Sequence, residues 1–162
     1  MIVVALGSNR AGPWGNPSQT VEHALAELNK GPLRLLKASR LLFTAPFGRV
    51  NQAPFVNAIA IVQSHLPPQA LLHRLHAIEF QAGRRRAMRW GPRTLDLDLI
   101  DYDGRVTGPL ARPRLPHPGI AERIFVLKPL AEIAPNWRHP VSRLGVKALL
   151  KRLHPQGEGA EL

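Results

Sequence analysis

The sequence predicts an α+β protein, namely a ferredoxin-like βαββαβ sandwich followed by a proline-rich C-terminal extension that contains short helices. Strand and helix patterns alternate as strand–helix–strand, twice, before about residue 107. The chain has 162 residues, 44% of them hydrophobic, which is enough for one buried core. Prolines are frequent in the remainder, where only two short helical patterns occur. We therefore expect one domain over 1–162, with a core at about 2–137 and an extension at about 138–162.

The first strand–helix–strand unit begins with an apolar strand at 2–6. Apolar residues then recur at helical spacing over 18–28, and Ser18 is the expected N-cap of this helix. Residues 33–43 are predicted to form the second strand, which ends in a turn-rich stretch at 44–54.

The second unit repeats this order, with a strand predicted at 55–62. Pro67-Pro68 opens a helix that ends at Gly83. Its apolar face consists of Leu71, Leu75, Ile78 and Ala82. The strand that follows carries two aspartates, and the turn signal Asp103-Gly104 favours a short hairpin partner at 105–106. Two short helical patterns follow in the proline-rich remainder of the chain, at about 121–133 and 142–153.

The charge balance narrows the partners that this chain could bind. Lys and Arg number 22 against 11 Asp and Glu, a net charge of +11, which fits either nucleic acid or a polyanionic small molecule. Aromatic residues make up only 6%, which gives little support to a base-stacking surface. The absence of cysteine excludes disulfides and thiolate metal sites, and no apolar run is long enough for a membrane span. We expect a cytoplasmic protein.

Two acidic residues stand two positions apart in an apolar run. Because side chains alternate in a strand, Asp96 and Asp98 should share one face while Leu95, Leu97 and Leu99 share the other. Such a carboxylate pair suits Mg²⁺, which takes one or two protein carboxylates and fills its other positions with water and phosphate oxygens. An ordinary solvent-facing strand edge is the alternative for an isolated pair.

Five arginines lie just upstream of this strand or at its start: Arg84, Arg85, Arg86, Arg89 and Arg93. Guanidinium groups form bidentate bonds to phosphate oxygens and stay charged at neutral pH, so this segment could neutralise a polyphosphate. The alternatives are a solvated basic loop and a nucleic-acid patch.

Three further positions could hold a ring or a phosphate. Phe55 and Asn57 share one strand face, where a ring and an amide could hold a flat heterocycle by stacking and edge hydrogen bonds. His117 stands between two prolines and could donate to a phosphate, although a lone histidine is more often structural. Core packing is the ordinary role of Phe125 and of Phe55.

The ordered motifs of this chain resemble those of the 6-hydroxymethyl-7,8-dihydropterin pyrophosphokinase family, over about residues 2–137. The most specific block is Arg89-Trp90-Gly91-Pro92-Arg93-Thr94-Leu95-Asp96-Leu97-Asp98. The other matching blocks are Leu6 to Asn9, Thr44 with Pro46, Gln52 to Asn57, Glu79 with Gly83-Arg84, Pro116-His117-Pro118, and Arg123 to Pro135. Position 55 is phenylalanine where many members have tyrosine, and the loop at 10–17 matches no family block.

The resemblance implies that pyrophosphate is transferred from ATP to the hydroxymethyl group of a reduced pterin, with release of AMP, in folate biosynthesis. It implies two Mg²⁺ ions held by Asp96 and Asp98 with ATP, and catalytic assistance from Arg84 and Arg93. The implied pterin contacts are Thr44, Phe47, Phe55, Asn57, Trp90 and Phe125. The implied ATP contacts are Arg84, Arg86, Arg93, Leu99, Arg112, His117 and Arg123.

Two other functions stay open on the residues alone: a basic nucleic-acid-binding ferredoxin-like domain, and another Mg²⁺-dependent nucleotidyl transferase. Acidic residues on a sheet strand would repel a nucleic-acid backbone, so the first is disfavoured. We expect ATP and the hydroxymethyl-dihydropterin as partners, no nucleic acid, no membrane, and a monomer.

Overall fold

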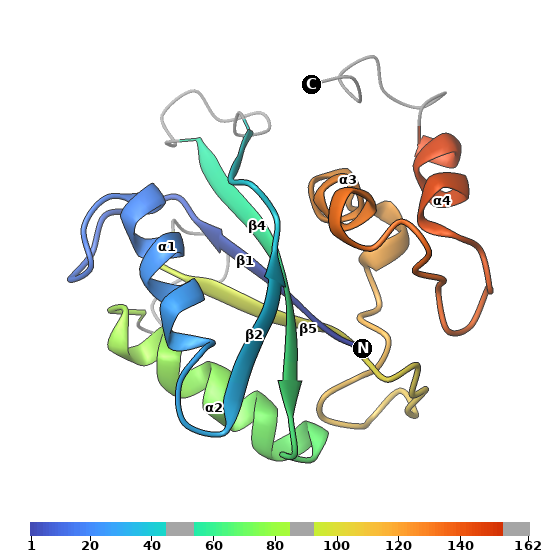
Figure 1. The fold of residues 1–162 in the computed structure, drawn as a ribbon, viewed down its shortest axis with the longest axis horizontal. Helices are drawn as coiled ribbons and strands as arrows, with labels where there is room; N and C mark the ends of the chain where they lie inside the picture. The colour runs from blue at the N-terminus through green and yellow to red at the C-terminus, as the bar shows by residue number, and fades with distance from the viewer. Residues whose placement is uncertain (45–53, 85–92, 154–162) are drawn as a thin grey trace.

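In the part of the chain that the structure describes, five strands form one sheet in the order β2-β4-β1-β5, with β3 also paired to β4, and all neighbouring strands are antiparallel (Figure 1). This computed structural model describes residues 1–44, 54–84 and 93–153. The strands are β1 (Ile2–Ser8), β2 (Leu33–Ala38), β3 (Leu42–Thr44), β4 (Phe55–Ser64) and β5 (Asp96–Tyr102). The helices are α1 (Pro17–Glu27), α2 (Pro68–Gln81), α3 (Ile124–Ile133) and α4 (Val146–Leu153), with a 3₁₀ turn η1 (Ile120–Glu122). None of the described helices could span a membrane.

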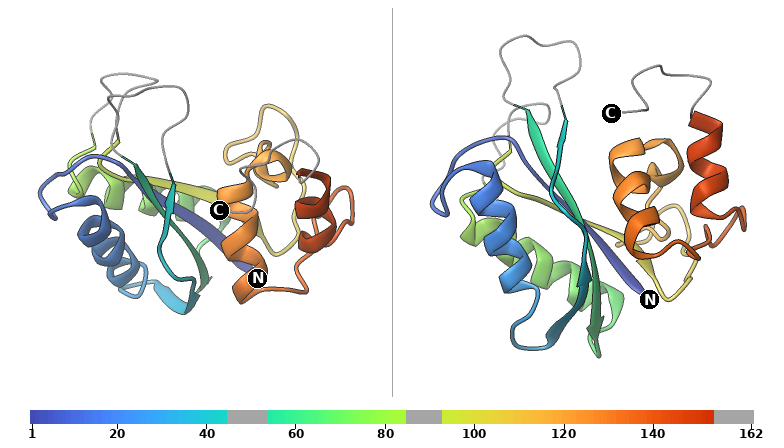
Figure 2. Two further views of the ribbon diagram at one scale, coloured as in Figure 1. Left: turned by 90° about the horizontal axis from the view of Figure 1, so that it is seen from above. Right: turned by 45° about the horizontal axis from the view of Figure 1, so that its top comes forward.

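Helices cover both faces of the sheet, α1 and α2 on one side and α3 and α4 on the other (Figure 2). The central strand β1 is buried on both faces, which explains its uninterrupted apolar sequence. Its residues Val4 and Leu6 enter the core under α1 and α2, whereas Val3 and Ala5 enter the core under α3 and α4. This mixed architecture confirms the predicted order of strands and helices in its coarse form.

The predicted strand over 33–43 is wrong in one respect, because the chain forms two strands, β2 and β3, with a break between them. Ser39 explains the break. Its hydroxyl oxygen accepts a hydrogen bond from the Ile59 N–H at 2.8 Å, and its own N–H donates to the Ile59 carbonyl at 2.8 Å. A side chain thus takes one ladder bond of β4, which interrupts regular pairing at this point.

Helix α1 begins earlier than predicted, because Asn16 and not Ser18 is its N-cap. The Asn16 side-chain oxygen accepts from the Gln19 N–H at 2.9 Å, and the Gln19 side-chain oxygen accepts from the Asn16 N–H at 2.9 Å. This reciprocal pair is a capping box, and Pro17 occupies the first helical position, where a missing N–H costs nothing.

The hairpin partner predicted at 105–106 does not form, although the turn does. Asp103 and Gly104 both have positive φ, at 52° and 72°, and the Gly104 N–H donates to the Asp101 carboxylate at 3.0 Å. The chain then turns away from β5, and the Thr107 N–H donates to the Leu115 carbonyl at 2.9 Å.

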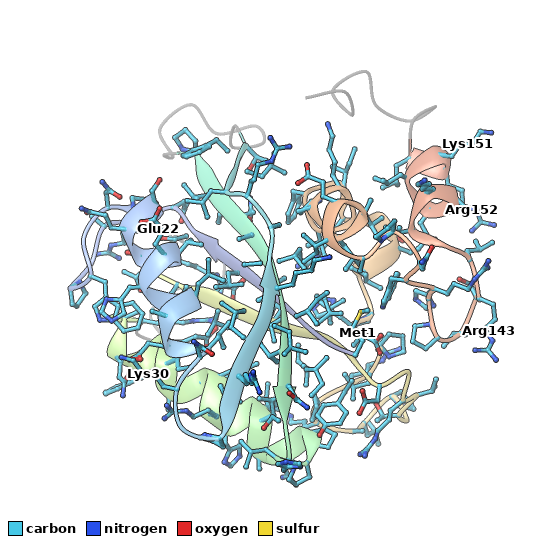
Figure 3. The ribbon with its side chains drawn as sticks, in the orientation of Figure 1. Met1, Glu22, Lys30, Arg143, Lys151 and Arg152 are labelled. Atoms are coloured by element: carbon cyan, nitrogen blue, oxygen red, sulfur yellow. The ribbon has the colours of Figure 1, made fainter. Side chains whose placement is uncertain are left out.

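The two helical patterns predicted at 121–133 and 142–153 are confirmed as η1 with α3, and as α4. Arg123 interrupts the first of them, because its ψ of 92° is not helical. Trp137 joins the segment after α3 to the sheet, since its indole N–H donates to the buried Asp101 carboxylate at 2.8 Å. Arg143, Lys151 and Arg152 lie on the outer side of the extension, at the far side of the molecule from α1 (Figure 3).

Candidate active site at the β5 edge

The aspartate pair lies on β5, the strand at one edge of the sheet. Leu97 and Leu99 are buried in the core under α1 and α2, and Asp96 and Asp98 point to the opposite face, as the alternation predicts. The side chains of Asp96 and Asp98 are 32% and 30% exposed. On β1 their partners are Gly7 and Ala5, whose small size leaves space beside the two carboxylates.

Two residues from other parts of the chain form hydrogen bonds to the backbone at the outer edge of β5. The carboxylate of Glu79, on α2, accepts a hydrogen bond from the Leu97 N–H at 2.7 Å, and the His117 N–H donates to the Ile100 carbonyl at 2.9 Å. These two contacts attach α2 and the segment around His117 to β5, and a cavity of about 270 Å³ lies between them. Its lining comprises Leu72, His76, Glu79, Arg84, Asp96, Leu97, Asp98, Leu99, Pro113, Arg114, His117 and Pro118.

Arginine side chains bind the acidic groups of this cavity. Arg84 forms ion pairs with Glu79 and, at 2.9 Å, with Asp96. Arg123 lies 3.6 Å from the carboxylate of Asp98. Each of these carboxylates therefore has at least one guanidinium beside it, so the site combines groups that can bind an anion with carboxylates that could bind a cation.

Burial makes the negative charge of this site costly. The pKa of Glu79 is raised to about 7, mainly by burial, although the Leu97 N–H and Arg84 oppose the rise. The pKa of Asp98 is raised to about 6, first by burial and then by the charge of Asp96, against the lowering effects of the arginines. The pair thus carries charge that the protein alone does not fully compensate.

His117 is neutral in this environment. Burial, and then the positive charge of Arg123, lower the pKa of its imidazole below the ordinary value of 6.5. Its Nδ1 atom accepts a hydrogen bond from the Gly119 N–H at 3.1 Å, so the ring proton resides on Nε2. The side chain can therefore act as a hydrogen-bond donor in the cavity.

A row of positions across the sheet connects the acidic pair with the predicted ring-binding residues. Asn57 on β4 pairs with Gly7 on β1, and Gly7 pairs with Asp96 on β5. A Cβ atom on Gly7 would lie 3.1 Å from the Asn57 side-chain oxygen, so glycine leaves the amide room between the two strands. The Asn57 amide in turn donates to the hydroxyl of Thr44 at 3.2 Å.

The two described aromatic candidates belong to the same side of the sheet. Phe55 is two positions from Asn57 on β4, so its side chain shares that face. Phe125, on α3, is half-buried and packs against the core on that side. The structure therefore brings together Thr44, Phe55, Asn57 and Phe125 on the face that also carries the aspartates.

Some predicted residues are not placed in the cavity. Arg112 is exposed and does not line it, whereas Arg114 does. Arg93 lies near enough to lower the pKa of Asp98. Phe47, Arg86 and Trp90 lie outside the described residues.

Glu79 is not among the predicted site residues, although it is only 5% exposed and contacts Arg84. A signal was available, because Leu72, His76 and Glu79 follow one another at helical spacing and therefore share one face of α2. A carboxylate beside the apolar positions of a helix indicates a buried partner.

The donor set fits a hard divalent cation. Asp96 and Asp98 offer carboxylate oxygens, and their charge is undercompensated, as the raised pKa of Asp98 indicates. Within residues 1–44, 54–84 and 93–153 no group of three or more His, Cys, Asp or Glu could hold a metal. The protein would therefore supply only part of a coordination shell, which is usual for Mg²⁺ bound together with phosphates.

A carboxylate pair with flanking arginines, beside a face with an amide and aromatic rings, is typical of an enzyme that transfers a phosphorus group to a second substrate. Sequence comparison then gives the family. The family model of 7,8-dihydro-6-hydroxymethylpterin-pyrophosphokinase (HPPK) matches residues 3–135, and the chain belongs to this family. It is therefore a transferase of the pyrophosphokinase class.

Individual relatives agree with this assignment. The chain is 42% identical over 143 residues to the 2-amino-4-hydroxy-6-hydroxymethyldihydropteridine pyrophosphokinase of Pseudomonas aeruginosa, covering 88% of this chain and 85% of that protein. The enzyme of the same name from Methylorubrum extorquens is 36% identical over 154 residues, covering 95% of this chain and 94% of that protein. These matches do not favour a nucleic-acid-binding domain or another nucleotidyl transferase.

Longer proteins share the fold. A solved HPPK-DHPS triple mutant from Plasmodium falciparum has a TM-score of 0.73 at 15% identity, covering 96% of this chain and 44% of that chain. The folic acid synthesis protein fol1 of Pneumocystis carinii is 33% identical over 152 residues, which cover 94% of this chain but 20% of that protein. The chain thus spans less than half the length of both proteins.

Proposed function

We propose that this enzyme transfers the pyrophosphoryl group of ATP to the hydroxymethyl group of 6-hydroxymethyl-7,8-dihydropterin in folate biosynthesis. The hydroxyl oxygen forms a bond to the β-phosphorus, the bond from that phosphorus to the α-phosphate oxygen breaks, AMP leaves, and the hydroxyl proton is released. One observation carries the proposal: Asn57, Gly7 and Asp96 form a continuous row across β4, β1 and β5. A ring bound at the amide and phosphates bound at the carboxylates would meet along this row.

Asp96 and Asp98 would hold two Mg²⁺ ions together with ATP. Bound there, the ions would neutralise phosphate charge and favour the ionised hydroxyl of the acceptor. Arg84 is positioned to bind phosphate oxygens because it already lies 2.9 Å from Asp96. Arg123, 3.6 Å from Asp98, extends the same positive field. Fixed charges of this kind stabilise a transition state without having to reorganise.

The remaining contacts of the two substrates follow from the same face. Asn57 would bind the pterin edge, since an amide offers both a donor and an acceptor, and Thr44 would fix the orientation of that amide. Phe55 and Phe125 would stack on the ring. His117 would donate from Nε2 to a phosphate, and Arg93 would bind phosphate as well. Contacts from Phe47, Arg86, Trp90 and Arg112 stay predictions.

We also infer that the sheet with α1 and α2 is a ferredoxin-like sandwich. The strand order supports this if β2 and β3 are counted as one interrupted strand, because the two helices then cross over between parallel strands on one face. Val146 and Leu149 of α4 belong to the core that also contains Val3, which supports a single domain with an appended extension. The monomeric state and cytoplasmic location stay predictions.

Formation of AMP tests the proposed function. Purified protein is incubated with ATP, Mg²⁺ and the hydroxymethyl-dihydropterin, and AMP is measured with and without the pterin. We expect pterin-dependent AMP from the wild type, none from Asp98→Ala, and wild-type rates from Asp103→Asn, an exposed aspartate just beyond the same strand. A folded wild type that forms no AMP would refute the reaction, and an active Asp98→Ala variant would refute the metal assignment.

A further inference from the structure

The loop that connects β1 to α1 is held in one shape by its own contacts. Gly12 and Gly15 exchange two backbone hydrogen bonds of 3.0 Å. Trp14 stacks on His23 of α1, with ring centroids 3.9 Å apart and an interplanar angle of 5°. The capping box at Asn16 then fixes the point where the loop enters the helix. A loop braced in this way can serve as a rigid support for other segments.

This loop holds the backbone of Arg93 directly. The Asn9 side-chain oxygen accepts a hydrogen bond from the Arg93 N–H at 2.7 Å. The Asn9 N–H donates to the Arg93 carbonyl at 3.0 Å. Asn9 thus satisfies both backbone groups of one residue, and it is only 3% exposed, so water does not compete for these bonds.

The same loop packs against the residues just before Arg84. A Cβ atom on Gly12 would lie 2.9 Å from the Ala82 carbonyl oxygen and 3.0 Å from Cγ2 of Thr94. Gly83 has a φ of 98°, and a Cβ atom there would lie 2.6 Å from Cδ of Pro13. The Ala82 carbonyl and side-chain atoms of Thr94 and Pro13 therefore approach these two glycines so closely that a larger residue at either position would force its neighbours to shift.

We propose that Asn9 and the loop at 9–15 are positioning elements, which fix Arg84 and Arg93 relative to the aspartate pair. The inference rests on the proposed function, because it assigns a catalytic consequence to the placement of these two arginines. Asn9 fixes the backbone of Arg93 through its two hydrogen bonds. Gly12 allows the loop to pack closely against Ala82, two residues before Arg84, and so helps to fix the position of Arg84. Misplacement of a charge-stabilising group by about 1 Å can cost about a hundredfold in rate.

A purely stabilising role would not account for Asn9. Its Nδ2 atom is buried and has no hydrogen-bond partner among the described residues. The stability that the hydrogen bond to its side-chain oxygen contributes is therefore offset by the cost of burying an unpaired donor. The neighbouring Ser8 hydroxyl is also buried and unpartnered within the described part of the chain, and it makes no bond to Arg93. Ser8 is therefore a matched control for Asn9.

The test compares Asn9→Ala with Ser8→Ala in the AMP assay, after circular dichroism has established that both variants are folded. We expect Asn9→Ala to lower kcat at least about tenfold while KM for the pterin changes less than about twofold. Ser8→Ala should keep kcat within about twofold of the wild type. In an Arg93→Ala background, Asn9→Ala should change kcat less than about twofold, because the group it positions is already absent.

An unchanged kcat in folded Asn9→Ala would overturn the inference. The inference would also be overturned if Asn9→Ala lowered kcat by the same factor with and without the Arg93 side chain, because that result would indicate an effect independent of Arg93. If Asn9→Ala does not fold, Gly12→Ala carries the test through the packing against Ala82 and Thr94, with the same expected loss in kcat. A wild type that forms no AMP would instead overturn the proposed function, and this inference with it.

Discussion

Replacement of Asp98 by asparagine should stabilise the protein while it abolishes turnover. The folded-state pKa of Asp98 is raised to about 6 from an ordinary value of 3.8. A carboxyl group with a raised pKa contributes stability when protonated, and this contribution is lost as the pH rises through about 6. At pH 7.5 the ionised side chain is therefore a net cost to the folded state, and an uncharged amide of the same shape removes that cost.

The size of the effect follows from the pKa. A rise from 3.8 to about 6 corresponds to about 3 kcal/mol at about 1.36 kcal/mol per pH unit. The side chain is 30% exposed, and solvent screens part of this energy. We therefore expect Asp98→Asn to raise the free energy of unfolding by about 1 to 3 kcal/mol at pH 7.5, and by about half as much at pH 5, where the folded carboxyl is mostly protonated.

Urea unfolding in the presence of EDTA measures this difference at both pH values. Asp103→Asn is the matched control, because the exposed Asp103 carboxylate pairs with the N-terminal amine on the surface, and this substitution should change stability by less than about 0.5 kcal/mol. Added Mg²⁺ should raise the unfolding midpoint of the wild type and leave that of Asp98→Asn unchanged. A variant that is equally or less stable than the wild type at pH 7.5 would refute the reasoning.

Three further substitutions test other contacts. Ser39→Ala removes the acceptor of a buried N–H of β4 and should lower the free energy of unfolding by about 1 to 3 kcal/mol, measured in urea; a change below about 0.5 kcal/mol would contradict it. Trp137→Phe leaves the buried Asp101 carboxylate without its indole donor and should lower the thermal midpoint, whereas an unchanged midpoint would exclude a role for this bond. Glu79→Ala removes one of the two carboxylates paired with Arg84 and should reduce kcat/KM for ATP at least about tenfold in the AMP assay; wild-type kinetics would argue against it.

Local patterns predicted the parts of this molecule that depend on a single element. The alternation of Asp96, Leu97 and Asp98 is a property of one strand, and the structure reproduces it. The apolar face of α2 at Leu71, Leu75 and Ile78 is a property of one helix, and these residues are buried as expected. In both cases the periodicity of the backbone determines which side chains reach the core.

Features that depend on two elements could not be predicted in this way. The break at Ser39 exists because its hydroxyl meets an N–H of β4, which is 20 residues further along the chain. The placement of Arg114 rather than Arg112 in the cavity depends on how an irregular segment crosses β5, for which no periodicity exists. Asn16 and Ser18 are both residue types that favour the N-cap position, and the reciprocal hydrogen bonds between Asn16 and Gln19 make Asn16 the cap.

The occupied outer edge of β5 has a consequence for solubility during folding and storage. A bare edge strand presents unpaired N–H and carbonyl groups on which a strand of another molecule can add, and such addition leads to aggregation. Here the Glu79 carboxylate binds one N–H of that edge and the His117 backbone binds one carbonyl. The residues that border the candidate active site therefore also shield this edge of the sheet against intermolecular pairing. Variants that remove the Glu79 carboxylate should aggregate more readily than variants in which Asp96 or Asp98 alone is changed.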